Sequence, residues 1–425
     1  MSDAWSPAYT PSLPPSPTPE DRGRGAAFRH RGFRNFWIAR FLAAFATQIV
    51  SVAIGWQIYA LTGNPLDLGL VGLVQFAPAL VLVLVTGHVS DRYNRRMIMG
   101  LGQLAEAFVA GAVLILTVSG MITATSIFAL LFVFGIARAF MNPASSSLVP
   151  NLVPPEDLAS AVALSTSSWQ VANILGPAAG GILYGLSAGA AYSVAFTFFA
   201  VATVFIVLVP RPAQKTMSEP SSWSTVVAGF RYVWHEKVVL GAISLDLFAV
   251  LLGGATALLP AYARDILVTG PWGLGILRSA AGAGAVLMAG YLTLRPVRDR
   301  AGVLMFAAVA FFGAFTVIFG LSRMVWLSAL ALALAGAADM ISVYIRETLM
   351  QLWTPDAVRG RVNAVNAIFI GASNELGEFR AGTMASLIGV VPAVVVGGVG
   401  TLVVAALWAY WFPDIRRVRH LRGRD

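Results

Sequence analysis

Twelve long apolar segments alternate with short polar stretches along the chain. Each apolar segment is close to the roughly 20 residues that an α-helix needs to cross the hydrocarbon core of a bilayer. The pattern predicts two sets of six membrane helices, at 35–61, 66–86, 97–119, 123–143, 164–186 and 190–210, and at 238–262, 272–293, 301–321, 325–346, 363–388 and 391–412. The chain is therefore predicted to be an all-α membrane protein with twelve transmembrane helices in two six-helix bundles.

The polar stretches divide the chain into five parts. A proline-rich segment at 1–32 is predicted to be a disordered tail, and a basic segment at 413–425 forms the opposite tail. The two helix bundles occupy 33–210 and 238–412, and a polar linker at 211–237 joins them. Apolar residues recur at helical spacing in the second half of this linker, which predicts a helix that lies along the membrane surface.

Composition agrees with a membrane protein and excludes several classes of function. Hydrophobic residues make up 57% of the chain and charged residues 12%, against roughly 25% charged residues in an ordinary soluble domain. The chain has no cysteine, no P-loop sequence, and its histidines lie outside the apolar segments. We therefore expect no metal, no cofactor and no ATP hydrolysis. A membrane-embedded enzyme or sensor is the less favoured alternative.

Basic residues predict the orientation of the chain in the membrane. Of 29 arginines and lysines, 22 lie in the tails and in the loops of one side, whereas only Arg264 and Arg323 lie in the opposite loops. Positively charged loops face the cytoplasm. The sequence thus predicts a multi-pass protein of the bacterial cytoplasmic membrane with both termini in the cytoplasm. Because the basic charge follows loops and tails, we expect contact with lipid and not with nucleic acid.

The two halves of the chain carry a repeated sequence. Residues 151–158 resemble residues 351–358, and Gly176 and Gly181 in the first half correspond to Gly377 and Gly382 in the second. Each copy leads from the loop after the fourth helix of its half into the fifth helix. The repeat predicts two pseudo-symmetric halves that arose by duplication.

A charged turn between the second and third apolar segments contains Gly87, Asp91, Arg92, Arg95 and Arg96. The pattern G-x-x-x-D-R-x-x-R-R at this place resembles the loop between helices 2 and 3 of the major facilitator superfamily. The resemblance implies the major facilitator fold and a gating loop. In that role Asp91 faces the positive amino-terminal end of the helix at 363–388, and the arginines pair with acidic groups and lipid headgroups when the cytoplasmic side is shut. The alternative is a solvated turn without a function.

A glycine-rich sequence in the helix predicted at 164–186 contains Gly176, Pro177, Gly180 and Gly181. It resembles the G-P-x-x-G-G core found in drug and proton antiporters of the same superfamily, although Ala163 and Ala172 stand where the longer pattern has glycines. Small residues permit close contact between helices. We expect this cluster, Gly180 included, to pack against the helix at 272–293. The alternative is ordinary packing of small residues, which gives no support to export.

Five carboxylates fall inside predicted membrane helices, where an acid is costly and is a functional candidate by default. In our order of preference for proton coupling they are Glu375, Glu106, Asp339, Asp246 and Glu378. The alternative for each is a structural ion pair with Arg138 or Arg380. Further candidates to line a central cavity are Trp56, Gln57, Phe76, Arg138, Trp169, Gln170, Asn173 and Asn374.

The stretch from Asn374 to Gly382, together with Ala39-Arg40-Phe41 and the charged turn, resembles the branch of the superfamily that contains bacterial enterobactin exporters. The resemblance runs from about residue 33 to residue 412. It implies export of a small amphipathic molecule, such as a siderophore or a drug, in exchange for protons. We expect the protein to be a monomer. Import or uniport by the same fold remains an alternative.

Overall fold

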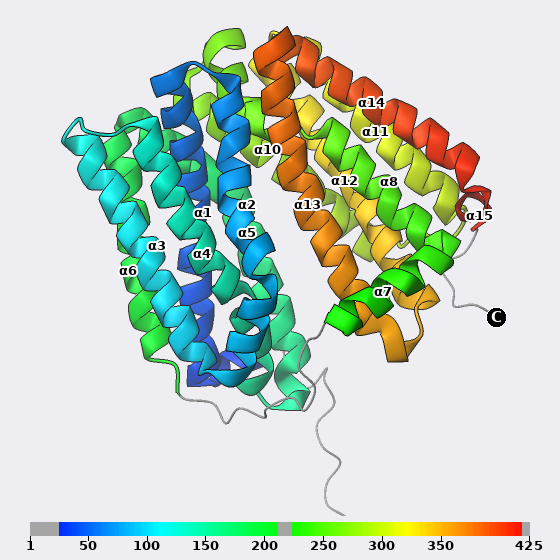
Figure 1. The fold of residues 1–425 in the computed structure, drawn as a ribbon, viewed down its shortest axis with the longest axis horizontal. Helices are drawn as coiled ribbons and strands as arrows, with labels where there is room; N and C mark the ends of the chain where they lie inside the picture. Colours follow the sequence, from blue (N-terminus) through cyan, green and yellow to red (C-terminus); the bar gives the residue numbers. More distant parts are fainter. Residues whose placement is uncertain (1–24, 211–222, 419–425) are drawn as a thin grey trace, which may run out of the picture.

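The computed structural model describes residues 25–210 and 223–418, which are almost entirely helical (Figure 1). The first six long helices are α1 (Arg31–Thr62), α2 (Pro65–Arg92), α3 (Arg95–Val118), α4 (Ala124–Leu148), α5 (Leu158–Leu186) and α6 (Ala188–Val207). The second six are α8 (Lys237–Gly253), α10 (Gly270–Leu294), α11 (Ala301–Leu321), α12 (Val325–Trp353), α13 (Asp356–Ile388) and α14 (Val390–Trp411). Every predicted membrane helix is present, and the predicted all-α fold is confirmed.

Shorter elements complete the described chain. They are α7 (Trp223–His235), α9 (Leu259–Ala261), α15 (Pro413–Arg417), the 3₁₀ turns Ala26–Arg29, Val149–Asn151, Pro155–Asp157 and Thr256–Leu258, and the π-helix Tyr262–Ile266. The helix predicted at 238–262 is interrupted, because α8 ends at Gly253 and Gly254 takes a non-helical conformation. Two adjacent glycines weaken a helix since they have the greatest backbone freedom to lose.

Side-chain caps define the ends of several helices. Asn64 accepts a hydrogen bond from the Leu66 nitrogen, with Pro65 in the first turn of α2. Asn94 does the same for Arg96 at the start of α3. Asparagine is a favoured N-cap, and proline costs little in the first turn, where its missing N–H has no partner to lose. The charged turn therefore also contains the residue that caps the start of α3.

The long helices form two bundles, which we call the N-terminal bundle (α1–α6) and the C-terminal bundle (α8 and α10–α14). Within the N-terminal bundle α1 packs on α5 and α6, and α4 packs on α2 and α3. Within the C-terminal bundle α11 packs on α12 and α14, and α10 packs on α12. Large buried side chains such as Phe36, Ile49, Phe134 and Phe199 fill the core of the N-terminal bundle.

Ten helical stretches of the described residues are long and apolar enough to cross a membrane by length and composition alone. Each lies on one of the long helices, and two of them, Ala124–Asn151 and Lys237–Ile266, also include the short elements that follow α4 and α8. The two long helices without such a stretch are α5 and α13, which carry the repeated glycine sequences. Each of these two helices contacts a helix of the opposite bundle: α5 packs on α10, and α13 packs on α2.

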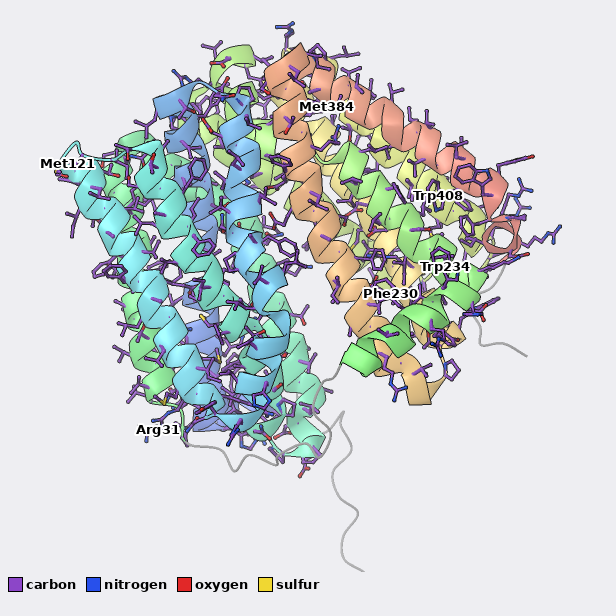
Figure 2. All side chains as sticks on the ribbon, in the orientation of Figure 1. Arg31, Met121, Phe230, Trp234, Met384 and Trp408 are labelled. Carbon is purple, nitrogen blue, oxygen red and sulfur yellow. The ribbon has the colours of Figure 1, made fainter. Side chains whose placement is uncertain are left out.

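The two bundles meet tightly at one end of the molecule, which we call the closed end. Figure 2 shows Met121, in the turn between α3 and α4, and Met384 of α13 toward this end, with Arg31 at the opposite end. Toward the opposite end α2 and α13 diverge (Figure 1). We call this second end the open end.

Glycines permit the contact between α5 and α10 at the closed end. A Cβ atom at Gly181 would lie 2.6 Å from the carbonyl oxygen of Pro271 and 3.0 Å from the Cα atom of Gly275. A real side chain at this position would push the helices apart, since Cβ atoms do not approach backbone so closely. The bundles therefore touch here through backbone atoms.

The contact between α2 and α13 repeats this arrangement. A Cβ atom at Gly382 would lie 2.8 Å from both the Gly69 nitrogen and the Pro65 carbonyl oxygen. In each case a glycine of the fifth helix of one half faces the first turn of the second helix of the other half. The structure thus gives the sequence repeat a role, because both copies close the same end of the molecule.

Polar contacts add to this closure. The Tyr59 hydroxyl of α1 donates a hydrogen bond of 2.5 Å to the Asp265 carboxylate of the π-helix. The Arg264 guanidinium donates to the Tyr59 carbonyl oxygen at 2.8 Å and lies 5.5 Å from the centre of the Tyr59 ring. Both interactions join the two bundles, so both would be lost if this end opened.

Helix α7 lies against α13. A Cβ atom at Gly229 would lie 2.7 Å from the Arg361 carbonyl oxygen, and Val233 is buried with Val362 and Val365. Figure 2 labels Trp234, which is 72% exposed, on this helix. The helix predicted in the linker is therefore present. Its position along a membrane surface stays a prediction.

Candidate functional site

Two neighbouring cavities lie near the middle of the molecule. The first has a volume of about 240 Å³ and the second a volume of about 170 Å³. They share the lining residues Ser51, Val71, Gln75 and Arg138. The first cavity lies inside the N-terminal bundle, and the second lies between the two bundles.

The first cavity contains a cluster of charged and amide side chains. Arg40 of α1, Gln103 and Glu106 of α3, and Arg138 of α4 all line it. Glu106 is 3% exposed and interacts electrostatically with both arginines, whose charges compensate its own. Arg138 also lies 5.9 Å from the centre of the Phe134 ring. Two cations and one anion thus share the same wall.

The second cavity places two carboxylates of α13 against a glycine of α2. A Cβ atom at Gly72 would lie 2.8 Å from Oε2 of Glu378 and closer still to Oε2 of Glu375, so both carboxylates point at the same spot. Their spacing of three residues places them on one face of α13. Only glycine leaves room for both at this point of contact between the bundles.

Arg278 of α10 faces this pair of acids from the C-terminal bundle. Its guanidinium donates a hydrogen bond of 2.7 Å to the Ser51 hydroxyl of α1, and it interacts electrostatically with Glu378. Arg138 interacts in the same way with Glu375. Each acid therefore interacts with one arginine, but Arg138 is shared with Glu106 of the first cavity. The four side chains come from α4, α10 and α13.

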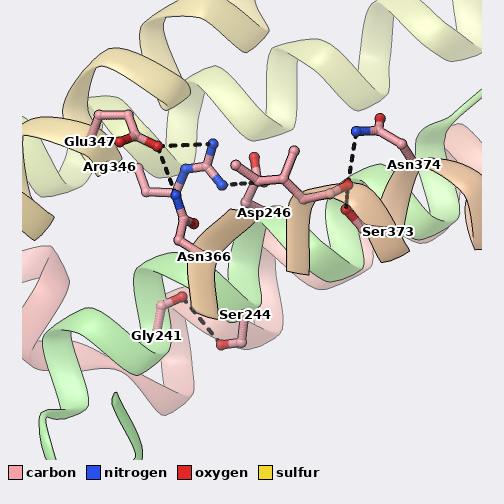
Figure 3. Close-up of polar contacts among 9 residues, drawn as sticks. Gly241, Ser244, Asp246, Arg346, Glu347, Asn366, Ser373 and Asn374 are labelled. Carbon is pink, nitrogen blue, oxygen red and sulfur yellow. Dashed lines mark hydrogen bonds and ion pairs between the residues drawn. The ribbon is translucent and has the colours of Figure 1, made fainter. Parts of the chain in front are cut away.

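Asp246 and Asp339 lie away from these two cavities, inside the C-terminal bundle. The Arg346 guanidinium of α12 donates to the Asp246 carboxylate of α8 and lies 3.8 Å from the Glu347 carboxylate (Figure 3). Asn366 donates to Glu347 at 3.0 Å. Asp246 and Asp339 line a third cavity of only about 10 Å³, which is room for about one water molecule.

The predicted cavity residues are found in several environments. Trp169 and Arg138 line the first cavity, and Asn173 accepts a hydrogen bond of 2.5 Å from the cavity residue Gln48. Phe76 packs at the contact between α2 and α13, where it faces Gly371.

The remaining predicted cavity residues are not among those that line the cavities. Gln57 donates to the Thr117 hydroxyl and accepts from the Tyr192 hydroxyl at 2.6 Å, and Trp56 packs on an apolar cluster of the C-terminal bundle. Asn374 is exposed and donates to the carbonyl oxygen of its own helix at residue 370. Gln170 is half-buried on α5.

The glycines of α5 face two different neighbours. Cβ atoms at Gly176 and Gly180 would meet α1, at 2.6 Å from Gln48 Cβ and 3.0 Å from Ile49 Cα respectively. Gly181 meets α10, as described above. The structure therefore corrects the expectation that Gly180 packs against the helix at 272–293. Adjacent residues differ by about 100° around a helix axis, so only one of them can face the other bundle.

The charged turn lies at the open end. The Arg95 guanidinium donates to the carbonyl oxygen of residue 147 at 3.0 Å, and Arg96 donates to the Val209 carbonyl oxygen at 2.7 Å. Arg92 is exposed, and a Cβ at Gly87 would meet open space. The side chain of Asp91 lies outside the described part of the structure.

Several polar cavity residues were not among the predicted site residues, and they include Arg40, Arg278, Gln103 and Ser51. The two arginines carried a usable signal, because a cation within a membrane helix faces the protein interior or a water-filled cavity. Gln103 and Ser51 had no comparable signal in the sequence, because such side chains are also common at ordinary helix contacts in membranes.

Comparisons with known proteins find relatives over nearly the whole chain. Two curated relatives are the enterobactin exporters EntS of Escherichia coli O1:K1 / APEC and of Shigella boydii serotype 18. Each is 27% identical over 406 residues, which cover 92% of this chain and 94% of the relative.

Solved structures show a similar fold at low sequence identity. An aspartate-to-alanine mutant of the nucleoside transporter NupG has a TM-score of 0.73 and 12% identity, with 90% of this chain and all of that one covered. A bacterial homolog of the human lysosomal transporter Spinster, in an inward-facing and unoccupied conformation, has a TM-score of 0.71 and 13% identity, covering 92% of this chain and 99% of that one.

The family described as "Transmembrane secretion effector" matches residues 23–418. This range includes all twelve long helices and every residue of the two cavities. The protein is therefore a membrane transporter and not an enzyme, and it belongs to the transmembrane secretion effector family of the major facilitator superfamily.

Proposed function

We propose that the protein exports a small amphipathic compound across the bacterial cytoplasmic membrane in exchange for protons. The single observation that carries the proposal is the pair of carboxylates in the second cavity, Glu375 and Glu378, which lies between the bundles. The names of the curated relatives support the export of a siderophore or a related compound.

The charges around the second cavity suit it to bind one proton. Glu378 interacts with Arg278, and Glu375 interacts with Arg138, which also lines the first cavity. When Arg138 is neutralised by Glu106, two acids share one arginine and one negative charge is left uncompensated. A single proton removes this charge, and the gain is large where water is excluded. Glu375 therefore remains our first choice for the coupling residue, followed by Glu106.

Asp246 is a less suitable coupling residue, because its charge is already compensated by Arg346 within one bundle. A buried acid that is paired within one bundle keeps the same partner as the bundles move. Its protonation state should therefore not change during the transport cycle. Asp339 lines a cavity whose described lining residues all belong to the C-terminal bundle, which makes it a later choice as well.

Alternating access requires the closed end to open while the open end closes. The glycine contacts of α5 with α10 and of α2 with α13 would then separate, and Glu375 and Glu378 would lose their contact with Gly72. The charged turn would form the opposite closure, with Asp91 near the start of α13. The two closures exclude each other, which is the condition for a two-state transporter.

The distribution of arginines supports an orientation for this cycle. The loops at the open end are the arginine-rich ones, so we propose that the open end faces the cytoplasm. In this conformation the cavities would accept substrate from the cytoplasm and release protons to it.

Uphill transport in proteoliposomes tests the proposal. Purified protein is reconstituted, a pH gradient is imposed, and accumulation of enterobactin is measured as the first test compound. We expect accumulation against the concentration gradient, and its loss in Glu375→Gln. Downhill exchange of enterobactin should persist in that variant, because binding and rocking do not require the charge.

The matched control is Asp299→Asn, which neutralises an exposed loop acid and should transport like the wild type. If Glu375→Gln, Glu106→Gln, Asp339→Asn, Asp246→Asn and Glu378→Gln all retain gradient-driven accumulation, proton coupling through these acids is wrong. Transport that is always downhill would favour a uniporter, and accumulation in the opposite direction would favour an importer.

A further inference from the structure

The first cavity belongs to one bundle only. Its lining residues come from α1, α2, α3, α4 and α5, and none of its described lining residues comes from the C-terminal bundle. A ligand in this cavity would therefore keep all of these contacts while the C-terminal bundle moves. The second cavity lacks this property, because its lining comes from both bundles.

Two buried side chains in the wall of this cavity have unused hydrogen-bonding atoms. Gln103 is fully buried, and neither its amide nitrogen nor its amide oxygen has a hydrogen-bond partner among the described residues. Oε2 of Glu106 also has no hydrogen-bond partner among the described residues, and Glu106 is 3% exposed. Buried polar atoms without partners are costly, and a polar ligand in the cavity would supply partners to both residues.

The charges in the cavity favour an anionic ligand. Arg40 and Arg138 bring two positive charges, and Glu106 brings one negative charge. A guanidinium presents a planar set of donors that matches the oxygen atoms of carboxylates and similar anions. When Glu106 neutralises Arg138, which also interacts with Glu375 of the second cavity, Arg40 retains a positive charge that an anion would compensate.

Aromatic side chains complete the lining. Phe134 and Trp169 both line the cavity, and Trp169 is 49% exposed. Arg138 lies close to Phe134 and would place a bound anion near that ring. An aromatic group attached to the anion can therefore pack on these side chains while its charge contacts the arginines.

We propose that Arg40, Arg138 and Gln103 form an anchor in the N-terminal bundle for an aromatic substrate that carries an anionic oxygen group. Glu106 compensates the arginines when the anchor is empty. The proposal names the substrate class of the proposed transporter and rests on its transport function, but it is independent of the direction of transport and of proton coupling.

Binding to the full-length protein in lipid nanodiscs tests the anchor without any gradient. The probes are naphthoate and its neutral analogue naphthamide, and equilibrium dialysis with naphthalene fluorescence gives their dissociation constants. We expect naphthoate to bind about tenfold more tightly than naphthamide or better. Arg40→Gln and Arg138→Gln should each weaken naphthoate binding about tenfold, because each removes a charge-assisted hydrogen bond.

Gln103→Leu separates a binding role from a structural one. Leucine has a similar size, and the amide that it replaces has no partner in the empty protein, so the melting temperature should stay the same or rise. Naphthoate binding should nevertheless weaken. If Arg40→Gln fails to fold, Arg138→Gln and Gln103→Leu still decide the question, since the Arg138 side chain is exposed in the cavity.

Arg295→Gln is the matched control, because it removes an exposed arginine outside the cavities. It should bind naphthoate like the wild type. The anchor is wrong if the wild type fails to bind naphthoate, if naphthamide binds equally well, or if the Arg138 and Gln103 variants bind as the wild type does. A failure of proton coupling would appear only in the transport assay, so the two proposals can fail separately.

Discussion

Replacing Gly181 by alanine should shift the protein toward the conformation in which the closed end is open. The new Cβ atom would lie 2.6 Å from the Pro271 carbonyl oxygen, about 0.8 Å short of the 3.4 Å at which ordinary contact begins. The atoms that it meets are backbone atoms of α10, which cannot rotate away as a side chain can. The strain is therefore relieved by separating the two bundles at this end.

The size of the shift follows from the usual cost of overpacking. An added methyl group in a well-packed contact costs about 1–3 kcal/mol. If this cost applies only while the closed end is closed, it changes the ratio of the two conformations by about 5-fold to 150-fold. Gly180→Ala is the matched control, because its Cβ atom would meet Ile49 and Val52 of the same bundle. That cost is paid in both conformations and lowers stability without changing their ratio.

Electron–electron distance measurements between spin labels can detect the shift. Met121 and Met324 are exposed turn residues at the closed end, one in each bundle, and the chain has no native cysteine to compete for labels. With labels at Met121→Cys and Met324→Cys, Gly181→Ala should add a population at longer distance. Identical distance distributions in Gly181→Ala and the unsubstituted labelled protein would refute the reasoning, as would an equal change in Gly180→Ala.

Three further substitutions test other contacts. Asp91→Asn should nearly abolish transport at normal expression, because it removes an anion whose contact with a helix amino terminus is worth about 0.3–2 kcal/mol; wild-type transport rates would contradict the gating role. Asp246→Asn should destabilise the folded protein by about 3–5 kcal/mol in denaturation experiments, since it removes the carboxylate to which the buried Arg346 donates and leaves only Glu347, 3.8 Å away; unchanged stability would contradict the structural ion pair. Tyr59→Phe removes the hydrogen bond to Asp265 and should lengthen the distances between labels at the closed end, whereas unchanged distances would show that this bond does not hold the end shut.

The fold could be predicted from the sequence because membrane helices leave a local signal. Apolar segments of the required length, and polar turns between them, identify the helices without knowledge of their contacts. The helix predicted at 238–262 shows the limit of this signal. Its apolar composition continues through Gly253 and Gly254, and hydropathy does not register the break that they introduce.

The contacts between helices could not be predicted from the same signal. Gly180 and Gly181 are adjacent and chemically identical, yet one faces its own bundle and the other faces the opposite bundle. Asp246 and Arg346 are 100 positions apart, and only the packing of α8 against α12 brings them together. The acids were recognised as candidates by their cost in the membrane, but their sorting into cavity residues and ion pairs required the structure.

The central claim is that export is coupled to protons. The most direct test is to measure proton movement that is driven by a substrate gradient alone. Proteoliposomes are prepared with equal pH on both sides and a pH-sensitive dye inside, and a concentration gradient of enterobactin is then imposed. The account predicts that enterobactin movement in one direction drives protons in the other, and that Glu375→Gln moves enterobactin without protons. Enterobactin movement in the wild type without any change of internal pH would contradict proton-coupled export.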